Sequence, residues 1–409
     1  MNNVITVIFL LLASKGSFLY TSNASWFVIL FLYIGIGLHY KRFTYYDLRV
    51  IGNFSLVFLA LMVFRYYFLN DLALRYLVTD ILFLIKYMFV CFLFFALLKE
   101  QAMIYLVKVI YWGAVISIPL YAFQLVAGNV LYTIGRSLPL AMDINNYSNI
   151  YVFTYVLGHH DRNCGFVWEP GAYGCFLNIA LMVNLAQNRF VLDKKSKWFV
   201  VAIITTLSTT SYLALLIIVL MYYRANGGKF SKIVFIGGPM MIALAFNLPF
   251  LFEKISKMYV HDMNDVDNIQ FLSEYYLEVG GELPLNRFSS AVYLWDLFGI
   301  HLLWGVSNPY QDTVTILKNV NISNGIIDFC AKFGVMGLSY LLYCFGKFFN
   351  LYAKSAELTI YSIIILLTLS FGEPILILPI ALIFLFVNYY INEEDMVYDD
   401  RVYEELQLN

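Results

Sequence analysis

Charged residues are scarce in this chain of 409 residues. They make up 13% of it, whereas hydrophobic residues make up 61% and aromatic residues 18%. Soluble domains contain about 25% charged residues, so this composition argues against a water-soluble fold. Outer-membrane strands alternate polar and apolar residues, and the apolar segments here lack that alternation. We therefore predict an all-α, polytopic integral membrane protein.

An excess of charge of either sign is also missing. The formal net charge is −1, so no basic surface for nucleic acid is expected. None of the five cysteines forms a CxxC or metal-ligand spacing, and the sequence contains no HExxH, GxSxG or phosphate-binding loop motif. We therefore expect no metal and no cofactor, and we interpret the cysteines as apolar packing residues.

Long apolar segments recur along the chain, and most approach the roughly 20 residues that a helix needs to cross a bilayer. The twelve segments lie near residues 3–20, 23–38, 51–69, 80–98, 103–127, 168–187, 198–209, 211–223, 233–251, 323–346, 357–371 and 374–391. Residues 1–391 are thus expected to form a single transmembrane domain, with outer loops at about 128–166 and 252–322. An acidic cytoplasmic tail, 392–409, follows.

The positions of lysine and arginine predict the sidedness. Basic clusters follow the second, sixth and tenth spans, flank the connection between the fourth and fifth, and precede the ninth. If all are cytoplasmic, the positive-inside rule holds throughout. This requires two short helices rather than one long span between Lys197 and Arg224. Both termini are then cytoplasmic, and both long loops are outside.

The stretch RNCGFVWEPGAYGCF places Arg162 and Glu169 just before the sixth span. Pro170 suits the first position of a helix, so Glu169 is expected beside the positive end of that helix. Glu169 is then a capping residue, a general base or a group that orients Arg162. The small residues of Gly171–Gly174 permit close approach of another helix or of a ligand.

The rest of the chain supplies further candidates. Arg287 opens a segment with helical apolar spacing, expected at the outer leaflet, where its guanidinium binds either lipid phosphate or substrate phosphate. For a second Glu-Pro pair, at Glu373, we favour a capping role because no arginine lies nearby in sequence. We interpret His301 as a packed neutral histidine, and His159 and His160 as solvated surface residues.

These residues resemble those of a known family. The pattern R-x-x-G-x-x-x-E-P-x-x-x-G, here Arg162–Gly174, is similar to that of the bacterial O-antigen polymerase and ligase superfamily. Lys332 stands where the family usually has an acid. The resemblance covers about residues 160–390, and the earlier spans match in hydrophobicity alone. Its other positions follow in the same order: the polar turn Ser208–Ser211, then Arg287 and Gly305 in the second outer loop, then Asn324 at the tenth span.

The resemblance implies a polysaccharide polymerase of the Wzy type. Such enzymes join repeat units carried on undecaprenyl pyrophosphate at the outer face of the bacterial cytoplasmic membrane, by metal-independent glycosyl transfer. The expected partners are this lipid-linked oligosaccharide, membrane lipid and a chain-length regulator protein. An O-antigen ligase is one alternative. A flippase or transporter of lipid-linked sugars is another, favoured by Lys86 inside the fourth span, and a membrane acyltransferase is a third.

The chemistry of this reaction assigns roles to the candidate residues. A leaving pyrophosphate needs positive charge, so Arg162 and Arg287 are expected to be catalytic. Activation of the acceptor hydroxyl needs a base, for which Glu169 is the candidate. Trp168 either stacks on a sugar ring or anchors the chain at the membrane interface. The expected substrate-binding residues are Arg136, His159, His160, Trp168, Gly305 and Asn324.

Overall fold

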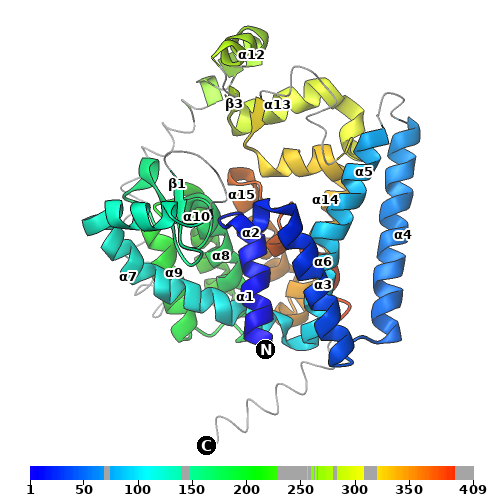
Figure 1. Cartoon of the computed structure of the whole chain (residues 1–409), viewed down its shortest axis with the longest axis vertical. Helices are drawn as coiled ribbons and strands as arrows, with labels where there is room; N and C mark the ends of the chain where they lie inside the picture. The colour runs from blue at the N-terminus through cyan, green and yellow to red at the C-terminus, as the bar shows by residue number, and fades with distance from the viewer. Residues whose placement is uncertain are drawn as a thin grey trace, which may run out of the picture.

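The computed structural model describes most of the chain. It covers residues 1–68, 74–139, 147–227, 256, 259–261, 263–264, 266–279, 283–307 and 320–391. The predicted span 233–251 and the acidic tail 392–409 lie outside these residues. The described part is mostly helical, as predicted (Figure 1). By length and composition, three of its helical stretches can cross a membrane: Tyr45–Tyr67, Tyr76–Arg136 and Gly325–Ala353.

The bounds of the elements are as follows. The first half contains α1 (Asn2–Ala13), α2 (Phe18–Thr21), α3 (Asn23–His39), α4 (Tyr45–Phe68), α5 (Leu74–Phe83), the π-helical turn η1 (Leu84–Met88), α6 (Phe89–Leu98), the 3-10 turn η2 (Lys99–Gln101) and α7 (Ala102–Arg136). The chain after α7 contains the 3-10 turn η3 (Leu157–His159), α8 (Pro170–Gln187), α9 (Lys194–Thr205), α10 (Thr209–Ala225), α12 (Ile269–Glu278), α13 (Arg287–Phe298), the 3-10 turn η4 (Gly299–Leu303), α14 (Gly325–Ala353), α15 (Ala356–Gly372), α16 (Pro379–Leu382) and α17 (Phe384–Val387).

Short strands interrupt the helical pattern in both predicted outer loops. In the first loop, β1 (Tyr147–Asn149) pairs antiparallel with β2 (Thr154–Val156). In the second, β3 (Leu283–Leu285) pairs parallel with β4 (Val320–Ile322). The all-α prediction is therefore wrong for these segments. Each is only three residues long, too short for a periodicity of two to be recognised in the sequence.

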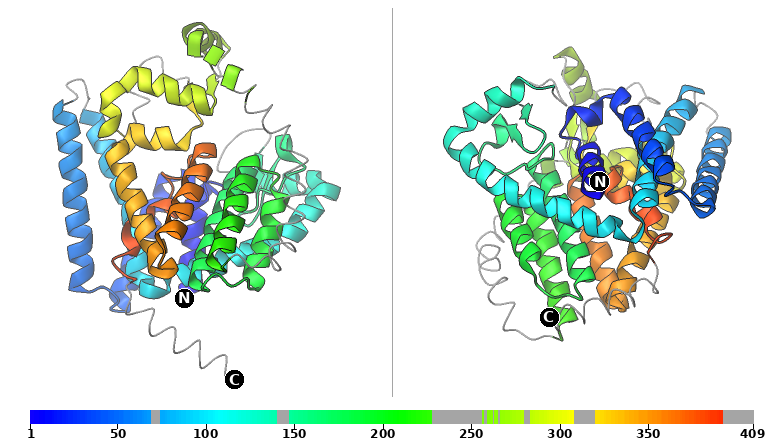
Figure 2. Two further views of the ribbon diagram at one scale, coloured as in Figure 1. Left: turned by 180° about the vertical axis from the view of Figure 1, so that it is seen from behind. Right: turned by 60° about the horizontal axis from the view of Figure 1, so that its bottom comes forward.

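Helix α8 is the centre of the bundle. Its side chains from Pro170 to Ala186 are all buried, and α7, α9, α10, α14 and α15 pack around it (Figure 2). A helix that is apolar on all sides is expected in such a central position. Asn178, which is buried, donates hydrogen bonds to the carbonyls of Gly174 and Ser211 at 2.7 and 3.3 Å.

Basic segments gather at the end of α8 that is remote from Glu169. The amide of Asn226, just after α10, donates to the carbonyl of Phe190, just after α8, at 3.1 Å. Arg224, at the end of α10, forms an exposed ion pair of 2.6 Å with Glu357, at the start of α15. Residues 198–223 thus form two helices, as predicted. The basic residues on either side of this pair lie at the same end of the bundle.

Two predicted spans are not continuous helices. In the segment 3–20, α1 ends at Ala13, because the hydroxyls of Ser14 and Ser17 donate to the carbonyl of Leu11 at 2.9 and 3.0 Å. The segment 374–391 forms only the short helices α16 and α17, both buried in the core. Its two prolines lack the N–H that a helix interior requires. Twelve regular spans are therefore not confirmed.

Helix α7 is longer than the predicted fifth span. A kink at Ala127, with φ −137° and ψ 41°, marks the predicted end of that span, but the helix resumes and continues to Arg136. Arg136 was expected in the first outer loop and is instead the last residue of α7. The kink has a local cause in the sequence, since Gly128 follows Ala127 and glycine weakens a helix interior.

Helix α4 stands at the edge of the bundle (Figures 1 and 2). Its outer face exposes apolar side chains such as Leu56 and Val57, 71% and 68% exposed, as expected of a face that contacts lipid. At one end, the buried Arg65 lies 3.5 Å from Asp80 of α5. A second nitrogen of Arg65 donates to the carbonyl of Lys332 in α14. This end of α4 is therefore bound to two neighbouring helices.

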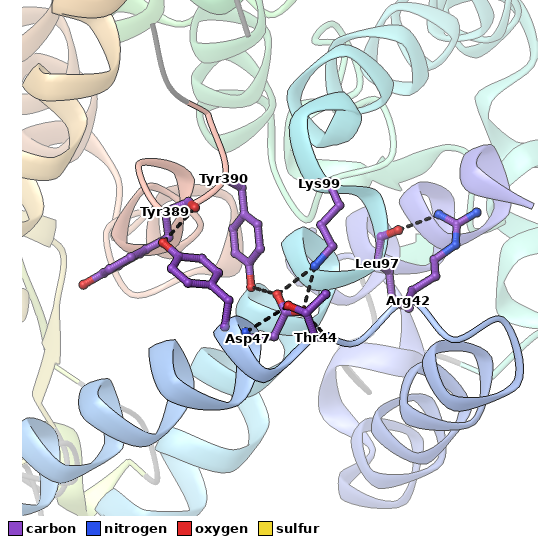
Figure 3. A network of polar contacts seen from close by, with 8 residues as sticks. Arg42, Thr44, Asp47, Leu97, Lys99, Tyr389 and Tyr390 are labelled. Atoms are coloured by element: carbon purple, nitrogen blue, oxygen red, sulfur yellow. Dashed lines mark hydrogen bonds and ion pairs between the residues drawn. The ribbon is translucent and has the colours of Figure 1, made fainter. Parts of the chain in front are cut away.

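The other end of α4 is held by the carboxylate of Asp47 (Figure 3). The Nζ of Lys99 lies 2.7 and 2.8 Å from its two oxygens, and the hydroxyl of Tyr390 donates to it at 2.6 Å. Thr44 donates to the same carboxylate from its backbone N–H and its hydroxyl, each at 2.7 Å. One buried carboxylate thus joins α4 to η2 and to the segment that follows α17.

We predict that Asp47→Ala destabilises the protein, because Lys99, Tyr390 and Thr44 lose their common acceptor. The expected loss is about 2–3 kcal/mol for removal of one partner from a buried ion pair, and about 1 kcal/mol for Tyr390→Phe. Thermal unfolding of the purified protein in detergent measures both. Arg224→Ala, which breaks an exposed ion pair, is the control and should cause no measurable change. Equal unfolding temperatures for Asp47→Ala and Arg224→Ala would contradict the assignment.

Candidate functional site

Five charged side chains from four segments meet where α8 begins: Lys15, Arg162, Glu169, Arg287 and Glu373. Lys15 interacts electrostatically with both glutamates. Glu373 interacts with Glu169 and with both arginines. All five side chains remain partly accessible to solvent. The structure thus brings together the three residues predicted to be catalytic and adds Lys15 and Glu373 to them.

Glu169 precedes α8 with an extended backbone, φ −155° and ψ 161°, and Pro170 takes the first helical position as predicted. Its side chain makes no capping hydrogen bond to the helix. The indole N–H of Trp168 donates to its Oε1 instead, and its carboxyl acts electrostatically on that of Glu373. The side chain of Glu169 therefore faces the charged cluster, and the capping interpretation is wrong.

Glu373 follows α15, and its backbone N–H donates to the carbonyl of Leu369 at 3.1 Å. Its side chain lies against α8: a Cβ added to Gly171 would come within 2.0 Å of Glu373 Oε1. A Cβ added to Gly325, the first residue of α14, would come within 2.4 Å of the carbonyl oxygen of Glu373. Three helix ends therefore fix this glutamate. Its backbone caps the end of α15, as favoured from the sequence, while its side chain lies in the charged cluster, where the sequence indicated no arginine nearby.

The environment of Glu373 disfavours its charged form. Burial raises the pKa of Glu373 well above its ordinary value, and the charge and hydrogen bond of Glu169 raise it further, whereas Arg287 and Arg162 act in the opposite direction. Two carboxyls within hydrogen-bonding distance cannot both be ionised at low cost. The glutamate pair therefore retains a proton at a pH where an isolated glutamate has lost its own.

Arg162 is held by a helix end. Its Nε donates to the carbonyl of Thr206, which caps the C-terminus of α9, at 3.0 Å. Gln124 of α7 donates to the backbone carbonyls of His160 and Arg162 at 2.8 and 3.0 Å, which fixes the segment before α8. No described carboxylate lies within 4.0 Å of the Arg162 guanidinium. Glu169 therefore does not hold Arg162 by a direct ion pair.

Arg287 is held in the same manner. Its Nη2 donates to the carbonyl of Gly372, the last residue of α15, at 3.0 Å. Its Nε is buried and has no hydrogen-bond partner among the described residues. Asn324 donates to the backbone carbonyl of Arg287 at 3.0 Å and accepts from two N–H groups in the first turn of α14. Asn324, predicted to bind substrate, thus holds Arg287, the first residue of α13, beside the start of α14.

Gly305 lies at a contact between backbones. It has φ +80° and faces Gly334, which has φ +78° and kinks α14. A Cβ on Gly305 would come within 2.5 Å of the backbone nitrogen of Gly334. Beside this contact, Val306 donates to the carbonyl of Ala331 at 2.7 Å. This predicted substrate-binding residue therefore fastens η4 to α14.

The remaining predicted residues divide between the cluster and its surroundings. Trp168, which is 8% exposed, belongs to the cluster because its indole N–H donates to Glu169. The Nζ of Lys15 lies 5.3 Å from the centroid of the Trp168 ring. His159 is half-buried beside Arg162. Burial and then the Arg162 charge lower its pKa, so that it is neutral at pH 7. His160 is exposed, and Arg136 ends α7 beside β1.

Lys15 was not among the predicted site residues. The break after α1 places it in the loop that leads to α2, and this loop lies against the segment before α8: a Cβ on Gly16 would come within 2.7 Å of the carbonyl oxygen of Phe166. Tyr147 of β1 also donates to the carbonyl of Gly16. A lysine inside an apolar run is the signal that identifies it, because such charges are costly unless they have a role.

Lys332, the departure from the family pattern, is neutralised locally. Its Nζ lies 2.9 Å from Asp328, one turn earlier on α14, and both side chains are largely buried. Comparison of the chain with protein-family models, curated proteins and solved structures finds no match.

We predict that Gly171→Ala destabilises the protein, because the added methyl group occupies the position of the Glu373 carboxyl. Overpacking of this kind costs about 1–3 kcal/mol. Gly52→Ala in α4, where no atom lies within 4 Å of the added Cβ, is the control and should not lower stability. Thermal unfolding in detergent distinguishes the two, and equal unfolding temperatures would show that Glu373 moves aside without cost.

Proposed function

We propose that this protein is a polysaccharide polymerase that joins undecaprenyl-pyrophosphate-linked oligosaccharide repeat units. The observation that carries the proposal is the set of three cations, Lys15, Arg162 and Arg287, none of which forms an ion pair with a described residue. A guanidinium binds pairs of phosphate oxygens. Positive charge also stabilises the charge that develops on a leaving pyrophosphate. The order of the motifs, which resembles that of the O-antigen polymerases, supports the same reaction.

In this proposal each group of the cluster has a defined role. Arg162 and Arg287 bind the pyrophosphate of the growing chain, and Lys15 adds a third positive charge. The acceptor sugar hydroxyl attacks the anomeric carbon, the bond from that carbon to the phosphate oxygen breaks, and its electron pair leaves with the lipid pyrophosphate. Glu169 accepts the hydroxyl proton. Trp168 offers an aromatic face to a sugar ring, although Lys15 lies over one side of it.

We further propose a cytoplasmic membrane protein of about twelve crossings with both termini in the cytoplasm and the site on the outer side. Two observations support this orientation. Asn2 lies 3.5 Å from Gln101, so the N-terminus is at the end of the bundle that holds Lys99 and Asp47. The basic residues around α9 and α10 lie away from the start of α8. The positive-inside rule then assigns the basic end to the cytoplasm.

The flippase alternative loses the residue that favoured it. Lys86 lies in the π-helical turn η1, and its Nζ donates to the side chain of Asn23 at 2.6 Å. Asn23 is the first residue of α3, so the charge reaches the end of a helix rather than standing in the middle of a span. Lys86 also lies 5.9 Å from the ring centroid of Trp26. A local structural role accounts for this lysine.

Reconstitution tests the proposal directly. Purified protein in lipid vesicles is given an undecaprenyl-pyrophosphate-linked repeat unit, and products are separated by size. A ladder of longer glycans supports the polymerase. Transfer of glycan only to an added lipid A-core acceptor would identify a ligase instead. Movement of the lipid between leaflets at unchanged glycan length would identify a flippase.

We predict that Arg162→Ala and Arg287→Ala each lower the rate of polymer formation about 100-fold or more, because each removes a charged donor to the pyrophosphate. The rate is measured as glycan bond formation in the reconstituted system. Arg224→Ala removes an arginine at the opposite end of the bundle and should retain the wild-type rate. Wild-type rates in either site variant would remove that arginine from the reaction.

We also predict that Lys15→Met raises the KM for the lipid-linked donor about tenfold or more, since a charge-assisted hydrogen bond contributes about 1.5–3 kcal/mol. Lys15→Arg keeps the charge and should retain most of the affinity. Lys108→Met is the matched control, because Lys108 also lies over an aromatic ring but is exposed on α7. If Lys15→Met and Lys108→Met give the same KM, Lys15 does not bind the donor.

A further inference from the structure

The role of Glu373 follows from the construction around it. The side chain comes from the turn after α15 and lies against Gly171, two residues after Glu169, so the Glu169 carboxyl acts on it as a close neighbour. Gly171 and Gly325 leave space for this turn between α8 and α14. A hydrogen bond between two carboxyls requires a proton on one of them, since an ionised carboxylate is an acceptor alone.

We propose that Glu169 and Glu373 share one proton and act as a single acid–base pair, with the proton resident on Glu373 and Glu169 ionised. The indole N–H of Trp168 supports this assignment, because it occupies an acceptor oxygen of Glu169. Among the described residues, none donates a hydrogen bond to the Glu373 carboxyl. In the transfer reaction, which this inference takes from the proposed function, the hydroxyl proton passes to Glu169.

The shared proton also sets the charge of the site. The groups around the pair in the described part of the chain are Lys15 after α1, His159 and Arg162 before α8, Cys175 on α8, Arg287 on α13, and Asp328 with Lys332 on α14. The histidine is neutral at pH 7, and the Asp328–Lys332 pair cancels.

Three cations then face one negative charge, which leaves two positive charges. A pyrophosphate diester carries two negative charges, one on each phosphate, so the resting site is complementary to a lipid pyrophosphate joined to a sugar. Without the proton, the site would carry one positive charge and a repelling pair of carboxylates. The shared proton thus determines two properties of the site: its affinity for the lipid-linked donor, and which carboxylate is available as the base.

Infrared difference spectroscopy tests the protonation without reference to activity. Wild-type protein in lipid at neutral pH should show the C=O stretch of a protonated carboxyl that is absent from Glu373→Gln. The same spectrum for both proteins would overturn the proposal even if the protein is a polymerase. If the band is present but no glycan is formed by the wild type, the shared proton stands and the polymerase proposal fails. Thermal unfolding confirms that each variant is folded.

Kinetics provide the second test. Glu373→Gln keeps a neutral hydrogen-bond donor, so it should leave the donor KM at neutral pH unchanged and lower the rate about tenfold, whereas Glu169→Gln lowers it about 100-fold or more. At alkaline pH the pair loses its proton and the KM should rise, a rise that Glu373→Gln abolishes. Because Lys15 also titrates at alkaline pH, the comparison is made in the Lys15→Arg background. A lower KM for Glu373→Gln at neutral pH would show that Glu373 is ionised, and the proposal would fail.

Discussion

Charge enters this apolar bundle where its helices end. A helix interior satisfies its own backbone groups, but the last carbonyls of a helix have no intrahelical donor and carry partial negative charge. Arg162 and Arg287 each bind such a carbonyl, that of Thr206 after α9 and that of Gly372 at the end of α15. A guanidinium held by a carbonyl leaves its positive charge uncompensated, whereas a paired carboxylate would neutralise it. The free charge at the start of α8 therefore depends on how the helix ends are arranged.

The sequence predicts much of the helical pattern, and the exceptions have local causes. The segments 168–187 and 357–371 correspond closely to α8 and α15, because proline, serine and glycine mark their ends. The bias of basic residues predicts that 198–223 contains two helices. The segment 374–391 is as hydrophobic as the others, and hydrophobicity alone does not separate a span from a buried irregular segment. In 3–20, two serine hydroxyls end the helix early. In the sequence, these two serines are a weaker signal than the apolar residues around them, which predict a continuous span.

The candidate site is predictable only in part, because some of its residues are close in sequence and others meet only in the fold. Arg162 and Glu169 are neighbours in sequence, so one motif identifies both. Glu373 joins them through contacts with α8 and α14 that are distant in the chain, and no local pattern indicates that Gly171 lies against its carboxyl. Asn324 and Gly305, which were predicted to bind substrate, hold backbone segments together around Arg287 and α14. A sequence motif identifies such constraints without showing which of them contacts a ligand.

The attachment of α4 has a mechanical consequence. Asp47 fixes one end of this helix to η2 and the C-terminal segment, and Arg65 fixes the region near the other end to α5 and α14. Between these points, much of its apolar surface contacts no other part of the described chain. A helix held near both ends cannot rotate away from the bundle as a rigid body, so it can move away only by bending at its middle. Any separation of α4 from the bundle thus opens sideways toward lipid, at mid-depth, while both ends remain in place.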